Sequence, residues 1–220
     1  MTILITGANR GIGRALHDQY SAQNTDVIGT SRSAMPPAPG QSWETLDVTD
    51  PSSHKALATR LKGKAIDLLI CNAGVYPDKH EALDTGFPAE MWAQAFATNT
   101  TGVFLTIQSL LPNLRAAKAP RVAIISSQMG SDTRAPGGSY IYRASKAAAL
   151  NLGRNLAVDL APQGIAVGIY HPGWVRTDMG GANGEISVQE ARAGLIARFE
   201  ALSLETTGCF ETWDGSAHPF

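Results

Sequence analysis

The chain has 220 residues, 44% of them hydrophobic, so it can bury a substantial core, and we interpret residues 1–220 as a single domain. Its 18 basic and 19 acidic residues leave a formal net charge of −1, which argues against a nucleic-acid partner. No apolar run approaches the roughly 18 residues that span a bilayer, and no secretion signal opens the chain. We therefore expect a cytoplasmic protein with no membrane segment, whose two cysteines, Cys71 and Cys209, are reduced.

Short apolar runs alternate along the chain with segments of helical periodicity. This alternation predicts an α/β fold with a doubly wound parallel sheet, buried strands and helices on both faces. In such a fold the ligand lies beyond the carboxyl ends of the strands. A stretch with three prolines, residues 33–42, is expected to be a surface connection. The expected strands are residues 3–6, 26–31, 65–71, 121–127 and 165–170, and the expected helices are residues 11–22, 52–62, 88–113 and 140–160.

A glycine-rich turn follows the first expected strand. The run TGANRGIG places Gly7, Gly11 and Gly13 in a G-x-x-x-G-x-G spacing just before a helix. Glycines let the backbone approach a pyrophosphate closely, and the free N–H groups and the dipole of the helix favour the anion. Because the turn lies in a strand-turn-helix unit, it predicts a dinucleotide site.

Two arginines indicate which dinucleotide binds. An NAD site usually places an acidic side chain about 20 residues beyond the glycines, but the second expected strand ends in GTSRS, with Arg32 and no carboxylate. Arg10 lies inside the glycine turn. Since guanidinium groups form charge-assisted hydrogen bonds with a 2′-phosphate, we predict NADP(H) over NAD(H). The alternative is that both arginines are solvated surface charges.

A tyrosine and a lysine stand four residues apart in the segment GGSYIYRASKAAALN. On a helix, Tyr142 and Lys146 share a face, whereas Tyr140 has only Ala144 at that offset. Tyr142 is therefore the candidate for chemistry. The pair alone is weak support, because aromatic and basic residues at this spacing occur on many amphipathic helices.

Several motifs together show a family resemblance: TGANRGIG, LDVTD, CNAGV, TNTTGVF, ISS, the Tyr142 and Lys146 pair, and HPGWVRT. With these motifs the chain resembles the short-chain dehydrogenases/reductases. The segments SSQMGS, HPGWVRTDMGG and TGCFETWDGSAHPF resemble the subgroup of C-factor-like and sniffer-type carbonyl reductases. The resemblance implies a Rossmann-type sheet of about seven strands.

The resemblance also implies functional residues. The catalytic set is Asn99, Ser127, Tyr142 and Lys146. The expected cofactor-binding set is Gly7, Asn9, Arg10, Gly11, Ile12, Gly13, Arg32, Asp47, Val48, Asn72, Ala73, Gly74, Tyr142, Lys146, Pro172, Gly173, Val175 and Thr177.

Each catalytic residue has an expected role. Tyr142 exchanges a proton with the substrate oxygen, and the ammonium of Lys146 lowers the pKa of the phenol. Ser127, expected at the end of its strand, hydrogen-bonds the substrate oxygen, with Ser126 as the alternative. Asn99 positions a water that relays protons to Lys146, or it is a buried asparagine that satisfies backbone groups.

The segment after the fifth expected strand resembles the nicotinamide-binding element of the family. Pro172 and Gly173 would form its turn, and Val175 and Thr177 would contact the carboxamide. Side chains that could line the substrate pocket or simply pack are Trp174, Met129 and Tyr76. His171 has no second ligand at a suitable spacing, so we expect no metal.

These observations predict an NADPH-dependent reductase that interconverts a small ketone or aldehyde and its alcohol. Only residues 173–187 separate the nicotinamide element from the next helical pattern, so we expect an open pocket without a large lid. The alternative is a dinucleotide-binding signalling or regulatory protein of the C-factor type. A redox sensor built on Cys71 is a more distant alternative. By resemblance, we expect a homodimer or homotetramer.

Overall fold

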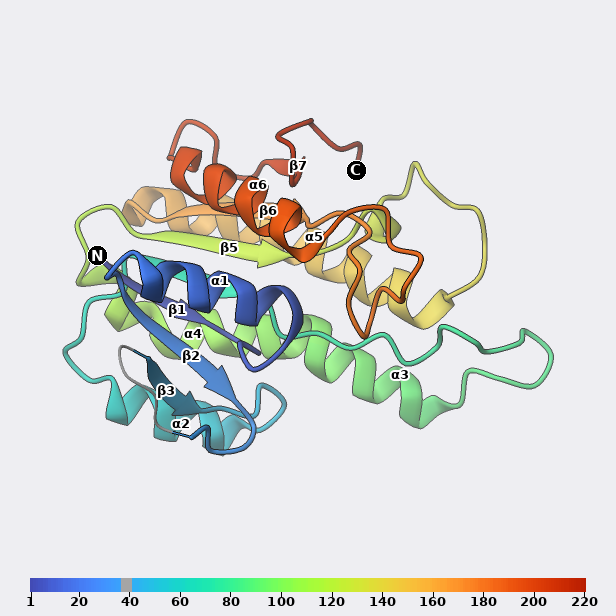
Figure 1. The fold of residues 1–220 in the computed structure, drawn as a ribbon, viewed down its shortest axis with the longest axis horizontal. Helices are drawn as coiled ribbons and strands as arrows, with labels where there is room; N and C mark the ends of the chain where they lie inside the picture. Colours follow the sequence, from blue (N-terminus) through green and yellow to red (C-terminus); the bar gives the residue numbers. More distant parts are fainter. Residues whose placement is uncertain (37–40) are drawn as a thin grey trace.

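The computed structural model describes residues 1–36 and 41–220, and these residues build one seven-stranded parallel sheet (Figure 1). The strands are β1 (Thr2–Ile5), β2 (Asp26–Ser31), β3 (Ser42–Thr45), β4 (Leu68–Cys71), β5 (Arg121–Ile125), β6 (Ala166–His171) and β7 (Phe210–Thr212). Their order is β3-β2-β1-β4-β5-β6-β7. The chain moves outward from β1 to β3 and then returns to β4 on the other side of β1. This reversal confirms the predicted doubly wound sheet.

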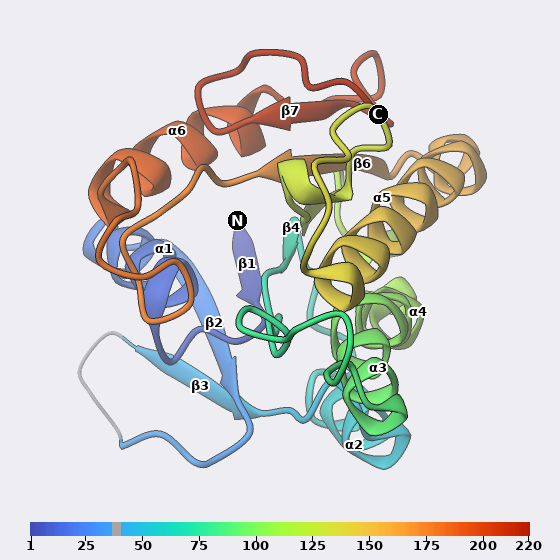
Figure 2. The same ribbon diagram turned by 90° about the vertical axis from the view of Figure 1, so that its right-hand side faces the viewer.

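The helices are α1 (Gly11–Ala22), α2 (Pro51–Arg60), α3 (Ala89–Phe96), α4 (Gly102–Arg115), α5 (Tyr140–Leu160) and α6 (Val188–Ala201). Figure 2 shows α1 and α6 on one face of the sheet and α2, α4 and α5 on the other. Adjacent residues of β1 serve opposite faces, because Leu4 belongs to the core with α2, α4 and α5, whereas Ile3 and Ile5 belong to the core with α1 and α6. Across residues 1–36 and 41–220, every helix is too short or too polar to span a bilayer.

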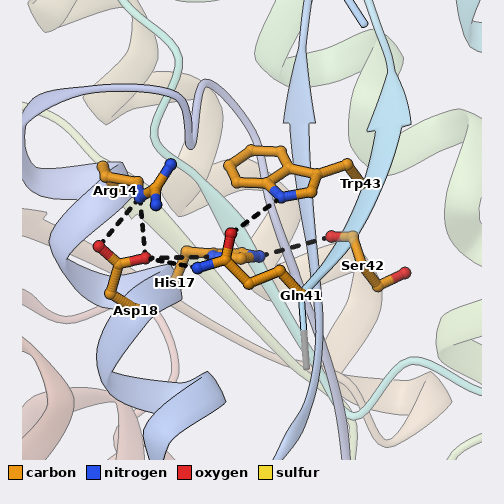
Figure 3. A network of polar contacts seen from close by, with 6 residues as sticks. All are labelled: Arg14, His17, Asp18, Gln41, Ser42 and Trp43. Carbon is orange, nitrogen blue, oxygen red and sulfur yellow. Dashed lines mark hydrogen bonds and ion pairs between the residues drawn. The ribbon is translucent and has the colours of Figure 1, made fainter. Parts of the chain in front are cut away.

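A polar and aromatic cluster holds the edge strand β3 against α1 (Figure 3). The Trp43 indole lies 4.3 Å from the buried ring of His17, measured between centroids, and the Arg14 guanidinium lies 5.6 Å from the Trp43 ring. A Cβ atom at Gly29 of β2 would approach Trp43 to 2.6 Å, so only glycine leaves room for the indole. The sequence prediction omitted β3 and also β7. Both are short edge strands that depend on tertiary contacts more than on a run of apolar residues.

The predicted strand 121–127 is too long, because β5 ends at Ile125. Ser126 still donates its backbone N–H to Tyr170 of β6 at 2.9 Å. At Ser127 the chain turns into the 3-10 helix η2 (Gln128–Gly130), and the Ser127 hydroxyl accepts from the Met129 N–H at 3.1 Å. Ser127 therefore caps a turn at the edge of the sheet instead of ending a strand.

The single helix predicted over residues 88–113 is interrupted by a π-helical turn, η1 (Ala97–Thr101), which contains Asn99. Such turns insert an extra residue into a helix and often occur at functional sites. The chain then resumes as α4 at Gly102, where a Cβ atom would lie 2.8 Å from the Val48 carbonyl oxygen. The surface connection expected at residues 33–42 falls partly on residues 37–40, which lie outside the described residues.

Candidate active site

A cavity of about 470 Å³ lies at the carboxyl ends of the central strands. It reaches from the glycine turn after β1, past the ends of β2 and β4, to the first turns of α5. The predicted residues that line it are Gly7, Asn9, Arg10, Gly11, Ile12, Arg32, Asp47, Val48, Asn72, Ala73, Gly74, Tyr142, Lys146, Pro172 and Thr177. The structure therefore brings together most of the residues expected at the cofactor and both members of the tyrosine and lysine pair.

The glycine turn is shaped by contacts that exclude side chains. Gly7 and Gly11 have φ angles of 63° and 55°, in the left-handed region that favours glycine. A Cβ atom at Gly7 would lie 2.9 Å from the Cα of Ala73, and one at Gly13 would lie 2.4 Å from the amide nitrogen of Asn72. The turns after β1 and β4 are thus packed backbone to backbone, between the two neighbouring strands at which the strand order reverses.

The amino end of α1 lies at this cavity, where the first N–H groups of a helix have no acceptor within the helix itself. Its N-cap residue, Arg10, makes no side-chain hydrogen bond to the helix, and its first turn contains no acidic residue. The unpaired N–H groups and the positive end of the helix dipole suit an anion such as a pyrophosphate. With the close glycine backbone, this arrangement fits a dinucleotide.

The two predicted 2′-phosphate ligands differ in their surroundings. Arg32 follows β2, is exposed and lines the cavity, and among the described residues no carboxylate lies within ion-pair distance of it. The Arg10 guanidinium instead lies 3.6 Å from the Asp178 carboxylate. Both partners are well exposed, so this ion pair is weak and screened by salt. Arg32 is therefore the stronger candidate for an incoming phosphate.

Tyr142 and Lys146 face the cavity from α5, one turn apart, as their spacing predicted. Both side chains are buried, with relative exposures of 8% and 4%. The Lys146 ammonium lies 5.7 Å from the centroid of the Tyr142 ring and donates to the Ile125 carbonyl at 2.9 Å. The lysine is thus anchored at the end of β5.

Burial, and not Lys146, dominates the acidity of Tyr142. Desolvation raises the pKa of the phenol to about 12; the nearby Ser127 hydroxyl opposes this rise, and Tyr76 and Asp78 add to it. Burial also lowers the pKa of Lys146 to about 8. In this structure burial outweighs the other influences on the phenol, and the Lys146 ammonium is turned toward the Ile125 carbonyl. The lowering of the phenol pKa by Lys146 together with bound cofactor stays a prediction. Tyr142 stays protonated at neutral pH, which is the form that donates a proton.

The two remaining catalytic candidates do not line the cavity directly. The Ser127 hydroxyl is close enough to Tyr142 to lower the pKa of the phenol. Ser126, the alternative, lines the cavity, and its hydroxyl donates to the Lys146 carbonyl at 3.0 Å. The buried Asn99 side chain accepts from the Val75 N–H and donates to the Val75 carbonyl, both at 2.9 Å. The Asn99 side chain thus satisfies backbone groups, and its role in positioning a water stays a prediction.

Three predicted cofactor residues also lie outside the cavity lining: Gly13, Gly173 and Val175. Gly13 and Gly173 are packing positions, since a Cβ atom at Gly173 would lie 2.4 Å from Ile186. Val175 is buried and forms a β-bridge with Ile186. These three residues shape the backbone around the cavity, and their contact with the cofactor stays a prediction.

Some features of the site escaped the sequence-based prediction. Asp178 and Met179 line the cavity directly after Thr177, so extending the predicted nicotinamide element by two residues would have found them.

Two residues considered in the sequence have other contacts in the structure. The Trp174 indole donates to the Gly180 carbonyl at 2.9 Å, within its own loop. His171 is buried beside His218, and across the described residues no group of three or more potential metal ligands occurs.

Comparison with known proteins identifies the family. The family model for short chain dehydrogenases matches residues 1–186. The chain belongs to the short-chain dehydrogenase/reductase family. Membership confirms the prediction of an oxidoreductase of the class that acts on CH–OH or C=O groups with a nicotinamide dinucleotide.

Three members of the family are similar to this chain over most of its length. The 1-hydroxy-2-glutathionyl-2-methyl-3-butene dehydrogenase of Rhodococcus sp. (strain AD45) is 35% identical over 98% of this chain and 97% of its own length. C-signal of Myxococcus xanthus is 35% identical over 76% of this chain and 99% of its own. The crystal structure of NADPH-bound carbonyl reductase from chicken fatty liver is 32% identical and covers 100% of this chain and 98% of its own, with a TM-score of 0.90. These similarities confirm the predicted fold and resemblance.

Proposed function

We propose that this short-chain dehydrogenase/reductase is an NADPH-dependent carbonyl reductase that converts a small ketone or aldehyde to its alcohol, with residues 1–220 acting as one catalytic domain. One observation carries the proposal: the Tyr142 phenol, the Lys146 ammonium, the glycine turn and Arg32 all line the same cavity. A proton donor, Tyr142, therefore lies in the same cavity as the glycine turn that would bind a dinucleotide. The similar chicken carbonyl reductase, whose structure contains NADPH, supports the choice of cofactor.

Bound NADPH would supply the hydride to the carbonyl carbon. The chain supplies the proton: the Tyr142 O–H donates to the carbonyl oxygen as the negative charge develops there, so that the C=O bond becomes CH–OH. The Ser127 hydroxyl, which lowers the pKa of the phenol, would donate to the same oxygen. Lys146 contributes positive charge near the phenolate left after proton transfer.

Replacement of Arg32 by alanine is expected to weaken NADPH binding by about 10- to 100-fold, because a charge-assisted hydrogen bond to the 2′-phosphate is lost. NADH binding should change by less than about threefold, since NADH lacks that phosphate. Fluorescence titration of both cofactors measures the effect. The exposed Lys118, outside the cavity, provides a control of equal charge change in Lys118→Ala. Equal losses for NADPH and NADH would contradict the role of Arg32.

The reaction itself is tested by NADPH oxidation against a panel of aldehydes, ketones and diketones, followed by product analysis. We expect turnover, and with deuterium at the transferable position of NADPH the label should appear on the carbinol carbon. NADPH that binds tightly while no carbonyl compound is reduced would contradict the reductase proposal. The broad panel matches the open pocket expected from the short segment after Gly173.

A second candidate function is supported by the similarity to C-signal. In that case the chain binds the dinucleotide as a signalling or regulatory protein, and its biological effect would survive Tyr142→Phe. Loss of the effect in that variant would instead assign the role to turnover. A homodimer or homotetramer remains our prediction for the assembly, and sedimentation measurements would test it.

A further inference from the structure

We propose that Asp78 is a positioning residue, which places the Tyr142 phenol in the active site by holding the first turn of α5. This inference rests on the proposed function, since it assigns to Asp78 a part in the work of Tyr142. Asp78 lies in the loop after β4 and is 1% exposed. Its carboxylate accepts from the Ile141 N–H at 2.8 Å and from the Tyr142 N–H at 3.2 Å, across 63 and 64 residues of sequence.

Asp78 replaces the cap that α5 lacks. The N-cap residue Ser139 has a φ angle of 48° and makes no side-chain hydrogen bond to the helix. Ile141 and Tyr142 occupy the positions whose N–H groups have no acceptor within a helix. A buried carboxylate facing the positive end of the helix satisfies both groups and fixes the backbone of Tyr142 itself.

The same loop also holds the tyrosine ring. Tyr76 stacks on Tyr142, with centroids 4.1 Å apart and planes inclined by 19°. The Tyr76 hydroxyl lies 2.6 Å from the Ser139 hydroxyl. The Ser139 side chain is therefore bonded to Tyr76 and does not cap the helix. Backbone and ring of Tyr142 are thus both fixed by residues 76–78.

This loop connects the proton donor to the cofactor cradle. Its preceding residues, Asn72 to Gly74, line the cavity, and Val75 is hydrogen-bonded through its N–H and carbonyl to Asn99. Asn99 in turn donates to the Ser145 hydroxyl of α5 at 2.9 Å. One short segment therefore sets the distance between the cofactor and the phenol, and a small displacement of a reacting group costs a large factor in rate.

The charge of Asp78 acts on Tyr142 as well. The titratable groups that face the phenol are Tyr76 and Asp78 from the loop and Lys146 from α5. The negative charge of Asp78 disfavours the phenolate. Its removal should therefore move the alkaline limb of the pH profile of carbonyl reduction, where the proton donor is lost, toward lower pH.

Two variants separate the effect of the Asp78 hydrogen bonds from the effect of its negative charge. Asp78→Ala removes the hydrogen bonds and the charge, and we expect kcat to fall by about 10- to 100-fold while the Kd for NADPH stays within about twofold. Asp78→Asn keeps one acceptor oxygen for the two N–H groups, so it should restore most of kcat yet retain the shifted pH profile. Asp50→Ala, which removes the exposed cap of α2, is the matched control and should change neither quantity.

A readout that needs no substrate distinguishes this inference from the proposed function. Amide hydrogen exchange at Ile141 and Tyr142 should accelerate in Asp78→Ala by about tenfold or more, relative to Lys146 on the same helix. Unchanged exchange, or unchanged kcat and pH profile in the folded variant, would overturn the role of Asp78. Faster exchange in Asp78→Ala, combined with no carbonyl turnover in the wild type, would support the role of Asp78 in holding α5 and would contradict the reductase proposal.

Discussion

Replacement of Tyr142 by phenylalanine is expected to lower kcat for carbonyl reduction by about 10²- to 10⁴-fold, the usual contribution of a positioned proton donor. The change removes only the hydroxyl, because Asp78 holds the backbone of residue 142 and Tyr76 stacks on its ring. The Kd for NADPH should therefore stay within about threefold. Initial rates at saturating NADPH and substrate, with a separate binding titration, measure both quantities.

Tyr140→Phe is the matched control for this experiment. Tyr140 begins the same helix, but its ring lies edge-on to Phe87, is 39% exposed and does not line the cavity. We expect its kcat to stay within about twofold of the wild type, as for most exposed substitutions. A Tyr142→Phe protein that keeps a rate near that of Tyr140→Phe would show that another group or water donates the proton.

Local patterns in the sequence were sufficient to predict the five central strands of the sheet and the glycine turn that lines the cavity. The apolar runs that became β1, β2, β4, β5 and β6 are buried on both faces, so composition alone marks them. The glycine turn is equally local, since Gly7, Gly11 and Gly13 form one strand-turn-helix unit. In contrast, β3 depends on Trp43 packing against His17 from another element. A four-residue edge strand of this kind has no pattern to recognise.

The reactive end was predicted only where spacing along one helix decides geometry. Tyr142 and Lys146 lie one turn apart on α5, so their neighbourhood follows from the helical repeat. The contacts of Asp78 and the pairing of Arg10 with Asp178 join segments far apart in sequence. Nor could spacing reveal that burial would outweigh Lys146 in its effect on the phenol pKa.

Replacement of Lys146 by methionine should reduce kcat by about 10²- to 10³-fold, the loss typical when one charge-stabilising donor is removed. The same change should stabilise the fold near neutral pH. In the native state burial lowers the pKa of Lys146 from 10.5 to about 8, so folding at pH 7 must desolvate an ammonium at a cost on the order of 3 kcal/mol. Loss of the hydrogen bond to Ile125 offsets this by about 1–2 kcal/mol.

The pH dependence of stability separates these two contributions. Between pH 8 and 10.5 the unfolded chain binds more protons at Lys146 than the native chain does, so the wild type gains stability as pH rises. The methionine variant lacks this gain. It should therefore unfold at higher denaturant concentration than the wild type at about pH 7 and at lower concentration above about pH 10.5, where only the lost hydrogen bond remains.

Lys118→Met, which removes an exposed lysine, is the control and should leave the wild-type pH dependence unchanged. A constant difference between Lys146→Met and the wild type across this pH range would mean that the buried ammonium does not destabilise the fold. A crossover combined with lost turnover would show that the chain keeps a destabilising charge at the position where proton transfer needs it. Active-site residues that destabilise the fold commonly explain why a more stable variant is less active.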